Sequence, residues 1–138
     1  MKPVLLDTGV IVSALDKRQR HHALCLQWME GLDRPMSTCE AVIMESCHLL
    51  RKMVGSSEAV LANLAHGHFQ IAFQLPRAVA EVKALMHKYR DTPIDFADAC
   101  LIHMADELDT GDILTLDSDF LHYRWRKTRP FNLLIPLG

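Results

Sequence analysis

Two acids stand directly after short apolar runs in this 138-residue chain. Asp7 follows the run at residues 4–6, and Asp117 follows the run at residues 113–116. Continuous apolar runs of this length are typical of buried parallel strands. Open α/β sheets place their chemistry at the carboxyl ends of such strands. We therefore expect both acids at the same edge of one sheet, although either alone also suits the N-cap of the next helix.

Three further acids are candidates for the same place. Helical spacing puts Glu45 on one face with the apolar Val42 and Leu49, which predicts a buried side. No Lys or Arg stands three or four residues from Glu45 to pair with it, and an unpaired Glu is almost never fully buried. Asp98 lies one turn into a predicted helix, where an acid also suits the helix N-terminus. Asp119 follows Asp117 in the same predicted loop.

Carboxylates gathered at one sheet edge predict a metal site. Like charges at short range raise one another's pKa and destabilise the fold unless a cation lies between them. Ligands that are all oxygen suit Mg²⁺ or Mn²⁺, which bind through a few carboxylates and keep waters for substrate phosphate. The predicted chemistry is hydrolysis of a phosphodiester by one or two metal ions.

The charge of the whole chain conceals an uneven distribution. Fifteen basic and 17 acidic residues give a formal net charge of −2, which argues against a dedicated nucleic-acid binder. Without the five candidate acids, 12 acidic residues remain against the 15 basic ones, a balance of +3. This indicates an acidic pocket in a mildly basic body.

A basic cluster near the end of the chain is a candidate RNA contact. Its aromatic residues would stack on bases while its cations hold phosphates. We expect Arg124, the nearest to the acidic loop in sequence, to be the first phosphate contact and Arg126 the second. A solvated basic face is the alternative interpretation. The cluster comprises Tyr123, Arg124, Trp125, Arg126, Lys127 and Arg129.

Other residue types exclude several classes of protein. The four cysteines form no C-x-x-C pair, and three of them lie among apolar residues, which predicts buried thiols. Two pairs of histidines, His21–His22 and His66/His68, could suggest a zinc site. Neither pair has the further protein ligands that zinc needs. The apolar runs fall short of the ~18 residues of a membrane span, and no secretory signal is apparent at the N-terminus. We expect a cytoplasmic protein without membrane contact.

Strands and helices alternate along the chain and must position the acids. Residues 37–40 fit a capping box, with Ser37 at the N-cap and Glu40 three residues later. Thr92 is expected to cap a later helix that has Asp95 as its third position. The pattern predicts one three-layer α/β/α domain over residues 1–138, with a central parallel sheet of four to five strands. The strands are predicted at 4–6, around 36, at 69–75, 112–117 and 131–135, and the helices at 10–15, 22–32, 39–54, 59–65, 76–89 and from 92 to about 108.

Four blocks of this sequence resemble the PIN-domain nucleases, and within them the VapC-like toxins of bacterial toxin–antitoxin pairs. Residues 5–8 are similar to the family's opening strand and first acid, and Glu45 to its second. Residues 95–99 resemble its D-x-x-D-A segment, which carries the third acid. Residues 113–120 resemble its closing T-x-D-x-D-F, which carries the fourth acid and often a fifth.

The resemblance implies a Mg²⁺- or Mn²⁺-dependent endoribonuclease that forms a homodimer and is held in check by a partner antitoxin. Asp117 is preferred to Asp119 as the principal metal ligand, because Asp117 directly ends the predicted strand. Thr8 and Ser118 are expected either to orient carboxylates or waters or to serve as turn hydroxyls. The implied catalytic acids are Asp7, Glu45, Asp98 and Asp117, and the implied metal ligands are these four with Asp119.

Other enzyme classes account for fewer of these residues. The D-T-G at residues 7–9 also matches retroviral-type aspartic proteases, but their fold is almost entirely β and would leave Glu45, Asp98 and Asp117 without roles. A haloacid-dehalogenase-type phosphatase would need an acid at Gly9. The remaining alternative is a PIN-like module that binds RNA or protein without cutting it. The full set of acids argues against such a module, since a binder gains nothing from their repulsion.

Overall fold

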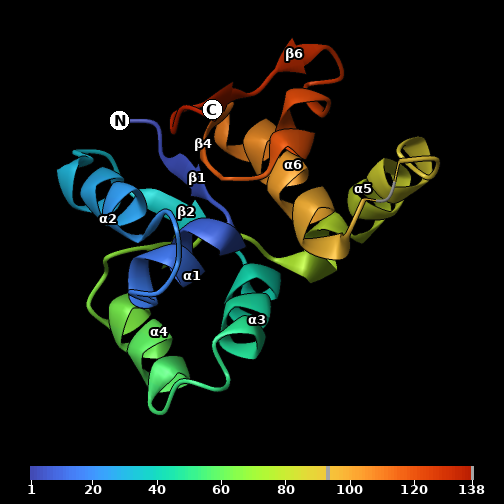
Figure 1. Cartoon of the computed structure of the whole chain (residues 1–138). Coiled ribbons are helices and arrows are strands. Elements are labelled where there is room, and N and C mark those ends of the chain that lie inside the picture. The colour runs from blue at the N-terminus through green and yellow to red at the C-terminus, as the bar shows by residue number, and fades with distance from the viewer. Residues whose placement is uncertain (93, 138) are drawn as a thin grey trace.

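A sheet of five short parallel strands forms the centre of the computed structural model, which describes residues 1–92 and 94–137 (Figure 1). The strands lie in the order β3-β2-β1-β4-β7. Leu5 pairs with Ile113 and Leu6 with Leu114, so β1 and β4 end side by side at the same edge. The strands are β1 (Val4–Leu6), β2 (Met36–Thr38), β3 (Gln70–Ile71), β4 (Asp112–Leu114) and β7 (Asn132–Leu133).

Helices cover both faces of this sheet, which confirms the predicted α/β architecture around a parallel sheet. In Figure 1, α1, α2 and α4 lie on one side, and α5 and α6 lie on the other. α3 contacts both α1 and α6 and thus joins the two groups. None of the described helices is long and apolar enough to cross a membrane. The helices are α1 (Thr8–Leu15), α2 (His22–Gly31), α3 (Glu40–Leu49), α4 (Ser56–Ala65), α5 (Leu75–Lys88) and α6 (Phe96–Leu108).

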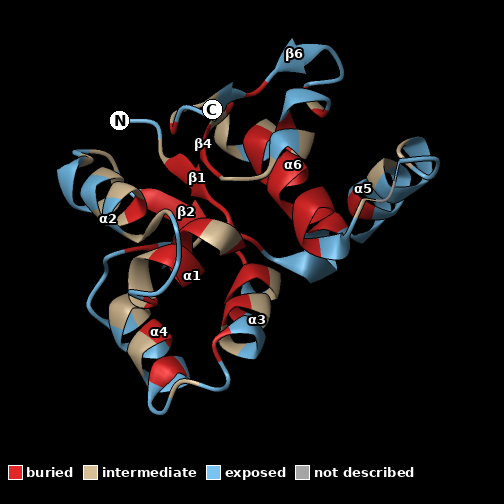
Figure 2. Cartoon of the chain, in the orientation of Figure 1, coloured by how far each residue is buried: buried red, intermediate tan, exposed pale blue. Residues whose placement is uncertain are grey.

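Helix α6 passes through the core of the molecule. Every residue from Ala97 to Ala105 is buried, and Figure 2 shows this continuous buried stretch beside the buried strand β1. The alanines and Cys100 in this segment are small enough for α5, α3 and β1 to pack against several sides of the helix. The helix therefore carries Asp98, in its first turn, into a buried position. The thiols of Cys25, Cys39 and Cys100 are buried, and Cys47 is half-buried.

The strand predicted at 69–75 is wrong in its extent. Pairing with β2 covers only Gln70 and Ile71, because β2 itself ends at Thr38. Helix α5 already begins at Leu75, with Pro76 in its first turn, where proline is well tolerated. Phe69 and Phe73 are buried outside the strand, so the period-two alternation reflects burial of an extended segment rather than strand pairing.

Two predicted helix caps are also wrong. Ser37 lies inside β2, and the N-cap of α3 is Cys39, without a side-chain capping bond. This helix ends at Leu49 rather than Val54. In α6 the N-cap is Asp95 rather than Thr92, and the Asp95 carboxylate accepts a hydrogen bond from the backbone N–H of Asp98 at 2.8 Å. Residue 93 of the predicted helix start lies outside the described residues.

A short hairpin closes the structure beside the end of α6. After the 3₁₀ helix η1 (Ser118–Leu121), strand β5 (Arg124–Trp125) pairs antiparallel with β6 (Arg129–Pro130). The buried Trp125 ring packs directly over Gly111, and the indole N–H donates to the carbonyl of Pro130 at 3.2 Å. A Cβ atom on Gly111 would lie 2.2 Å from Trp125 Nε1, so only glycine allows this contact.

We therefore predict that Gly111→Ala lowers the free energy of unfolding by about 1–3 kcal/mol, because the buried indole must move to make room for the methyl group. Urea denaturation followed by circular dichroism measures the change. Gly31→Ala is the matched control, since a Cβ there meets nothing within 4 Å, and we expect it to be neutral or stabilising. Equal stability of the two variants would show that Gly111 is not constrained by Trp125.

Candidate metal centre at the carboxyl edge of the sheet

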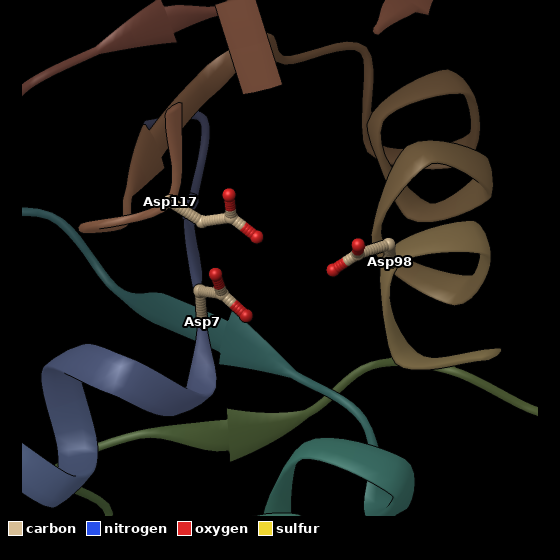
Figure 3. A group of neighbouring side chains, drawn as sticks. All are labelled: Asp7, Asp98 and Asp117. Atoms are coloured by element: carbon tan, nitrogen blue, oxygen red, sulfur yellow. The ribbon is translucent and has the colours of Figure 1, made fainter. Parts of the chain in front are cut away.

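Three carboxylates from distant parts of the chain meet at the carboxyl edge of the sheet. Asp7 follows β1, Asp98 lies in the first turn of α6, and Asp117 lies in the loop after β4. One oxygen from each lies within 4.8 Å of the other two. Figure 3 shows the three side chains pointing into a common space. The group is compact enough that it could hold a metal ion between the three carboxylates.

The three acids line a hollow of about 260 Å³, which we call the carboxylate hollow. Two further acids take part in its wall. Glu45 comes from α3, and Asp95 immediately precedes α6. The hollow is lined by Asp7, Thr8, Gly9, Glu45, Leu49, Asp95, Asp98, Leu116 and Asp117, without a Lys or Arg among these described residues.

Asp7 is both a helix cap and a member of the acidic cluster. Its Oδ1 accepts a hydrogen bond from the backbone N–H of Thr8 at 2.8 Å, which caps α1. Its Oδ2 accepts from the buried hydroxyl of Thr115 at 2.7 Å. The Thr115 hydroxyl also accepts from the backbone N–H of Asp117 at 3.0 Å. Thr115 therefore fixes the relative positions of the first and last acids.

Asp98 is held by a tyrosine from the C-terminal part of the chain. The Tyr123 hydroxyl donates to Asp98 Oδ2 at 3.1 Å. The tyrosine is fully buried, and the rings of Tyr89 and Phe120 contact it edge-on, each with its centroid 5.1 Å away. Burial and the Asp98 charge raise the pKa of Tyr123, so the phenol keeps its proton and remains a donor.

Burial makes the charged state of this cluster unfavourable. It raises the pKa of Asp7 to about 6, against the opposing hydrogen bonds from Thr115 and Thr8. Burial, followed by the charge of Asp95, raises the pKa of Asp98 to about 8. The pKa of Glu45 is raised by the same two causes in the same order. A bound cation would reverse these shifts, because it stabilises the ionised carboxylates.

The donor set fits a hard divalent cation. Carboxylate oxygens are the preferred protein ligands of Mg²⁺ and Mn²⁺. The Thr8 hydroxyl adds an independent observation: its oxygen is buried and is without a hydrogen-bond partner among residues 1–92 and 94–137. Because buried polar groups are normally satisfied, this orphaned oxygen at the wall of the hollow is consistent with a water or ion in the site. Asp7, Asp98 and Asp117 are the residues that would hold the ion.

Of the other predicted site residues, Glu45 lines the carboxylate hollow, whereas Asp119 and Ser118 do not. Glu45 is half-buried in the wall of the hollow, but its predicted neighbour Leu49 is 54% exposed rather than buried. Asp119 donates its backbone N–H to Asp117 Oδ1 at 2.9 Å, and its own side chain does not line the hollow. Ser118 is exposed and also lies outside the lining.

The predicted stacking of bases on Tyr123 and Trp125 is wrong, because both rings are buried. Arg124 directs its Nη1 to the backbone carbonyls of Leu121 and Tyr123, each at 2.9 Å. Arg126 pairs with Asp109 at the C-terminal end of α6, at 3.0 Å, whereas Asp98 lies at the N-terminal end. Neither arginine lines the carboxylate hollow.

Sequence reasoning did not place three residues beside these carboxylates. Asp95 was expected only as the third position of a helix capped by Thr92, although its charge also acts on Asp98 and Glu45. Thr115 stands two residues before Asp117 in the T-x-D-x-D-F block, so that motif was an available signal. Tyr123 had no such signal, since its contact with Asp98 spans 25 residues of sequence.

We predict that the metal-free protein loses stability as the pH rises from about 4 to about 8. The folded pKa values of Asp7 and Asp98, about 6 and about 8, exceed the ordinary value of 3.8, so over this range the folded state binds more protons than the unfolded state. The pKa shift of Asp7 alone corresponds to a loss of roughly 3 kcal/mol in the free energy of unfolding. Thermal unfolding in EDTA at several pH values measures the effect.

Asp98→Asn should remove the part of this pH dependence that lies between about pH 6 and 8, since the amide does not titrate. Glu58→Gln, at an exposed position on α4, is the matched control and should keep the wild-type profile. A wild-type stability that rises steadily through this pH range would contradict the assigned shifts.

Comparisons with known proteins agree with this fold. The family model of the PIN domain matches residues 4–126. The ribonuclease VapC26 of Mycobacterium tuberculosis is 27% identical over 137 residues, which cover 98% of this chain and 94% of that protein. The crystal structure of VapC20 of M. tuberculosis, a sarcin-ricin loop cleaving toxin, superposes with a TM-score of 0.79 at 14% identity, over 92% of this chain and 99% of that chain. The match over most of its length shows that this chain belongs to the PIN domain family.

Proposed function

We propose that this protein is a ribonuclease that hydrolyses RNA phosphodiester bonds with Mg²⁺ or Mn²⁺, and that it is the toxin of a toxin–antitoxin pair. The observation that carries the proposal is the convergence of Asp7, Asp98 and Asp117, whose carboxylate oxygens lie within 4.8 Å of one another. No Lys or Arg is found among the residues of 1–92 and 94–137 that line the hollow, so no basic side chain there offsets the charge of the cluster. The similarity to the ribonuclease VapC26 supports RNA as the substrate.

A divalent ion in the carboxylate hollow would supply Lewis acidity to the scissile phosphate and to the attacking water. The protein's own residues orient its ligands. Thr115 holds Asp7 Oδ2, and Tyr123 holds Asp98 Oδ2, which leaves Asp98 Oδ1 without a hydrogen bond from Tyr123. This fixed geometry lowers the reorganisation needed when the substrate binds.

We assign Glu45 to accept the proton of the attacking water. It lies in the wall of the same hollow but outside the group of three close carboxylates. Burial and the charges of Asp95 and Asp117 raise its pKa. A carboxylate with a raised pKa is a better base near neutral pH than an ordinary one. Its half-buried position leaves it accessible for passing the proton on to solvent.

The proposal includes the partners that the VapC-like resemblance implies. These are a cognate antitoxin protein and a second copy of this chain in a homodimer, within the cytoplasm. The similarity to two proteins described as a ribonuclease and a toxin supports this assignment. A module that binds RNA or protein without cutting it is the outcome that would replace the proposal.

We predict metal-dependent cleavage when the pure protein is incubated with a panel of structured RNAs. Cleavage should occur with Mg²⁺ or Mn²⁺ and stop in EDTA, as followed by denaturing gel electrophoresis. Asp7→Asn should reduce the rate by more than about 100-fold, because the metal supplies several kcal/mol of transition-state stabilisation. Glu58→Gln, distant in sequence and exposed on α4, should cleave like the wild type.

Cleavage that persists unchanged in Asp7→Asn would disprove the assigned site. Metal-independent binding of RNA without cleavage of any member of the panel would favour the non-catalytic module. A thermal unfolding curve for Asp7→Asn accompanies the assay, because this side chain also caps α1. A folded but inactive variant is the expected result.

A further inference from the structure

A second hollow, of about 360 Å³, lies at the same edge of the sheet as the carboxylate hollow. Its residues follow β2 and β3, just as Asp7 follows β1. The two hollows share the start of α6, because Asp95 lines the first and Phe96 lines the second. They also share α3, which contributes Glu45 to the first and Glu40 to the second. Figure 1 shows the beginnings of α5 and α6 meeting beside α3.

Phe96 is the aromatic wall of this second hollow, which we call the Phe96 hollow. Its side chain is 39% exposed, although the nine residues that follow it in α6 are all buried. An exposed aromatic ring beside an open hollow is a stacking surface for an unpaired base. The backbone position of Phe96 is fixed, because it is the first residue of α6 after the Asp95 cap.

The polar residues of the Phe96 hollow suit a nucleotide better than they suit a metal. Arg77 lines it, and the guanidinium group of this exposed residue forms no ion pair or hydrogen bond with any residue in the described part of the chain. Gln74 also lines it and offers an amide for base edges. Glu40 is the one carboxylate among its lining residues, against five in the carboxylate hollow.

We propose that the Phe96 hollow binds one unstacked nucleotide of single-stranded RNA next to the scissile phosphate, with its base on Phe96 and its phosphate on Arg77. The inference rests on the proposed ribonuclease function and adds to it the residues that hold a nucleotide beside the carboxylate hollow. Bases inside a duplex are stacked on one another and cannot reach the ring of Phe96.

The test measures binding apart from cleavage. Fluorescence anisotropy follows a 5′-labelled single-stranded RNA 12-mer of mixed sequence, in EDTA, at pH 6 and low ionic strength. Phe96→Ala should weaken binding by about 5- to 100-fold, the range expected for loss of one base–aromatic stack. Phe96→Trp should restore binding to within about twofold of the wild type. The same strand annealed to its complement should not respond to either substitution.

Arg77→Gln should weaken binding of the single strand and reduce the magnitude of the slope of log affinity against log salt by about 0.7, as expected for one phosphate contact on a single strand. Arg77→Lys should keep that slope. Val79→Ala is the matched control for the substitutions at Phe96 and Arg77. Val79 is 53% exposed, lies on α5 like Arg77, and does not line the Phe96 hollow. Circular dichroism and thermal unfolding verify that each variant is folded.

Wild-type affinity in Phe96→Ala would overturn the proposal. It would also be overturned if Phe96→Ala and Val79→Ala both shifted the protein to a smaller species in sedimentation velocity and weakened RNA binding equally, since this face would then be a protein interface. The proposed function is tested separately by cleavage. If the wild type binds RNA without cleaving it, and Phe96→Ala loses that binding, the nucleotide site is supported and the nuclease function is rejected.

Discussion

The repulsion among three carboxylates, two of them buried and the third half-buried, is the constraint that the rest of this structure must accommodate. Asp7, Asp98 and Asp117 approach one another within 4.8 Å, and burial raises the pKa of the first two. Hydrogen bonds from Thr115 and Tyr123 compensate only part of this cost. A protein that needed only a stable core would not maintain such a cluster, so the arrangement indicates a cation and the chemistry that a cation supports.

Two features of the fold bring the acids together. The parallel register of β1 and β4 places Leu6 opposite Leu114, so the segments that carry Asp7 and Asp117 leave the sheet at one edge. The small side chains of α6 allow this helix to run through the core, which carries Asp98 to the same edge. The same helix start also separates the carboxylate hollow from the Phe96 hollow. One element thus positions a metal ligand and the proposed nucleotide contact.

Local patterns in the sequence were sufficient for the architecture and for the acids that follow strands. The run before Asp7 predicted both its strand and its position, because a buried parallel strand is recognisable by its continuous apolar residues. An alternation of apolar and polar residues reports burial, and it gave a wrong strand where a buried segment does not pair with a neighbouring strand. Phe73 is an example, because it is buried but lies outside β3. The Tyr123 contact could not be predicted, since neighbouring basic residues suggested a solvated face and its partner lies 25 residues away. Long-range contacts of this kind depend on how the elements pack.

The central claim is that three distant segments form one cation site, and titration of Mn²⁺ into the metal-free protein by isothermal calorimetry tests it most directly. The wild type should show saturable binding at neutral pH, and protons should be released as the carboxylates ionise. Asp98→Asn should weaken this binding by at least tenfold, whereas Glu58→Gln should leave it unchanged. Absence of saturable binding in the wild type, or binding that is unaffected in Asp98→Asn, would contradict the account.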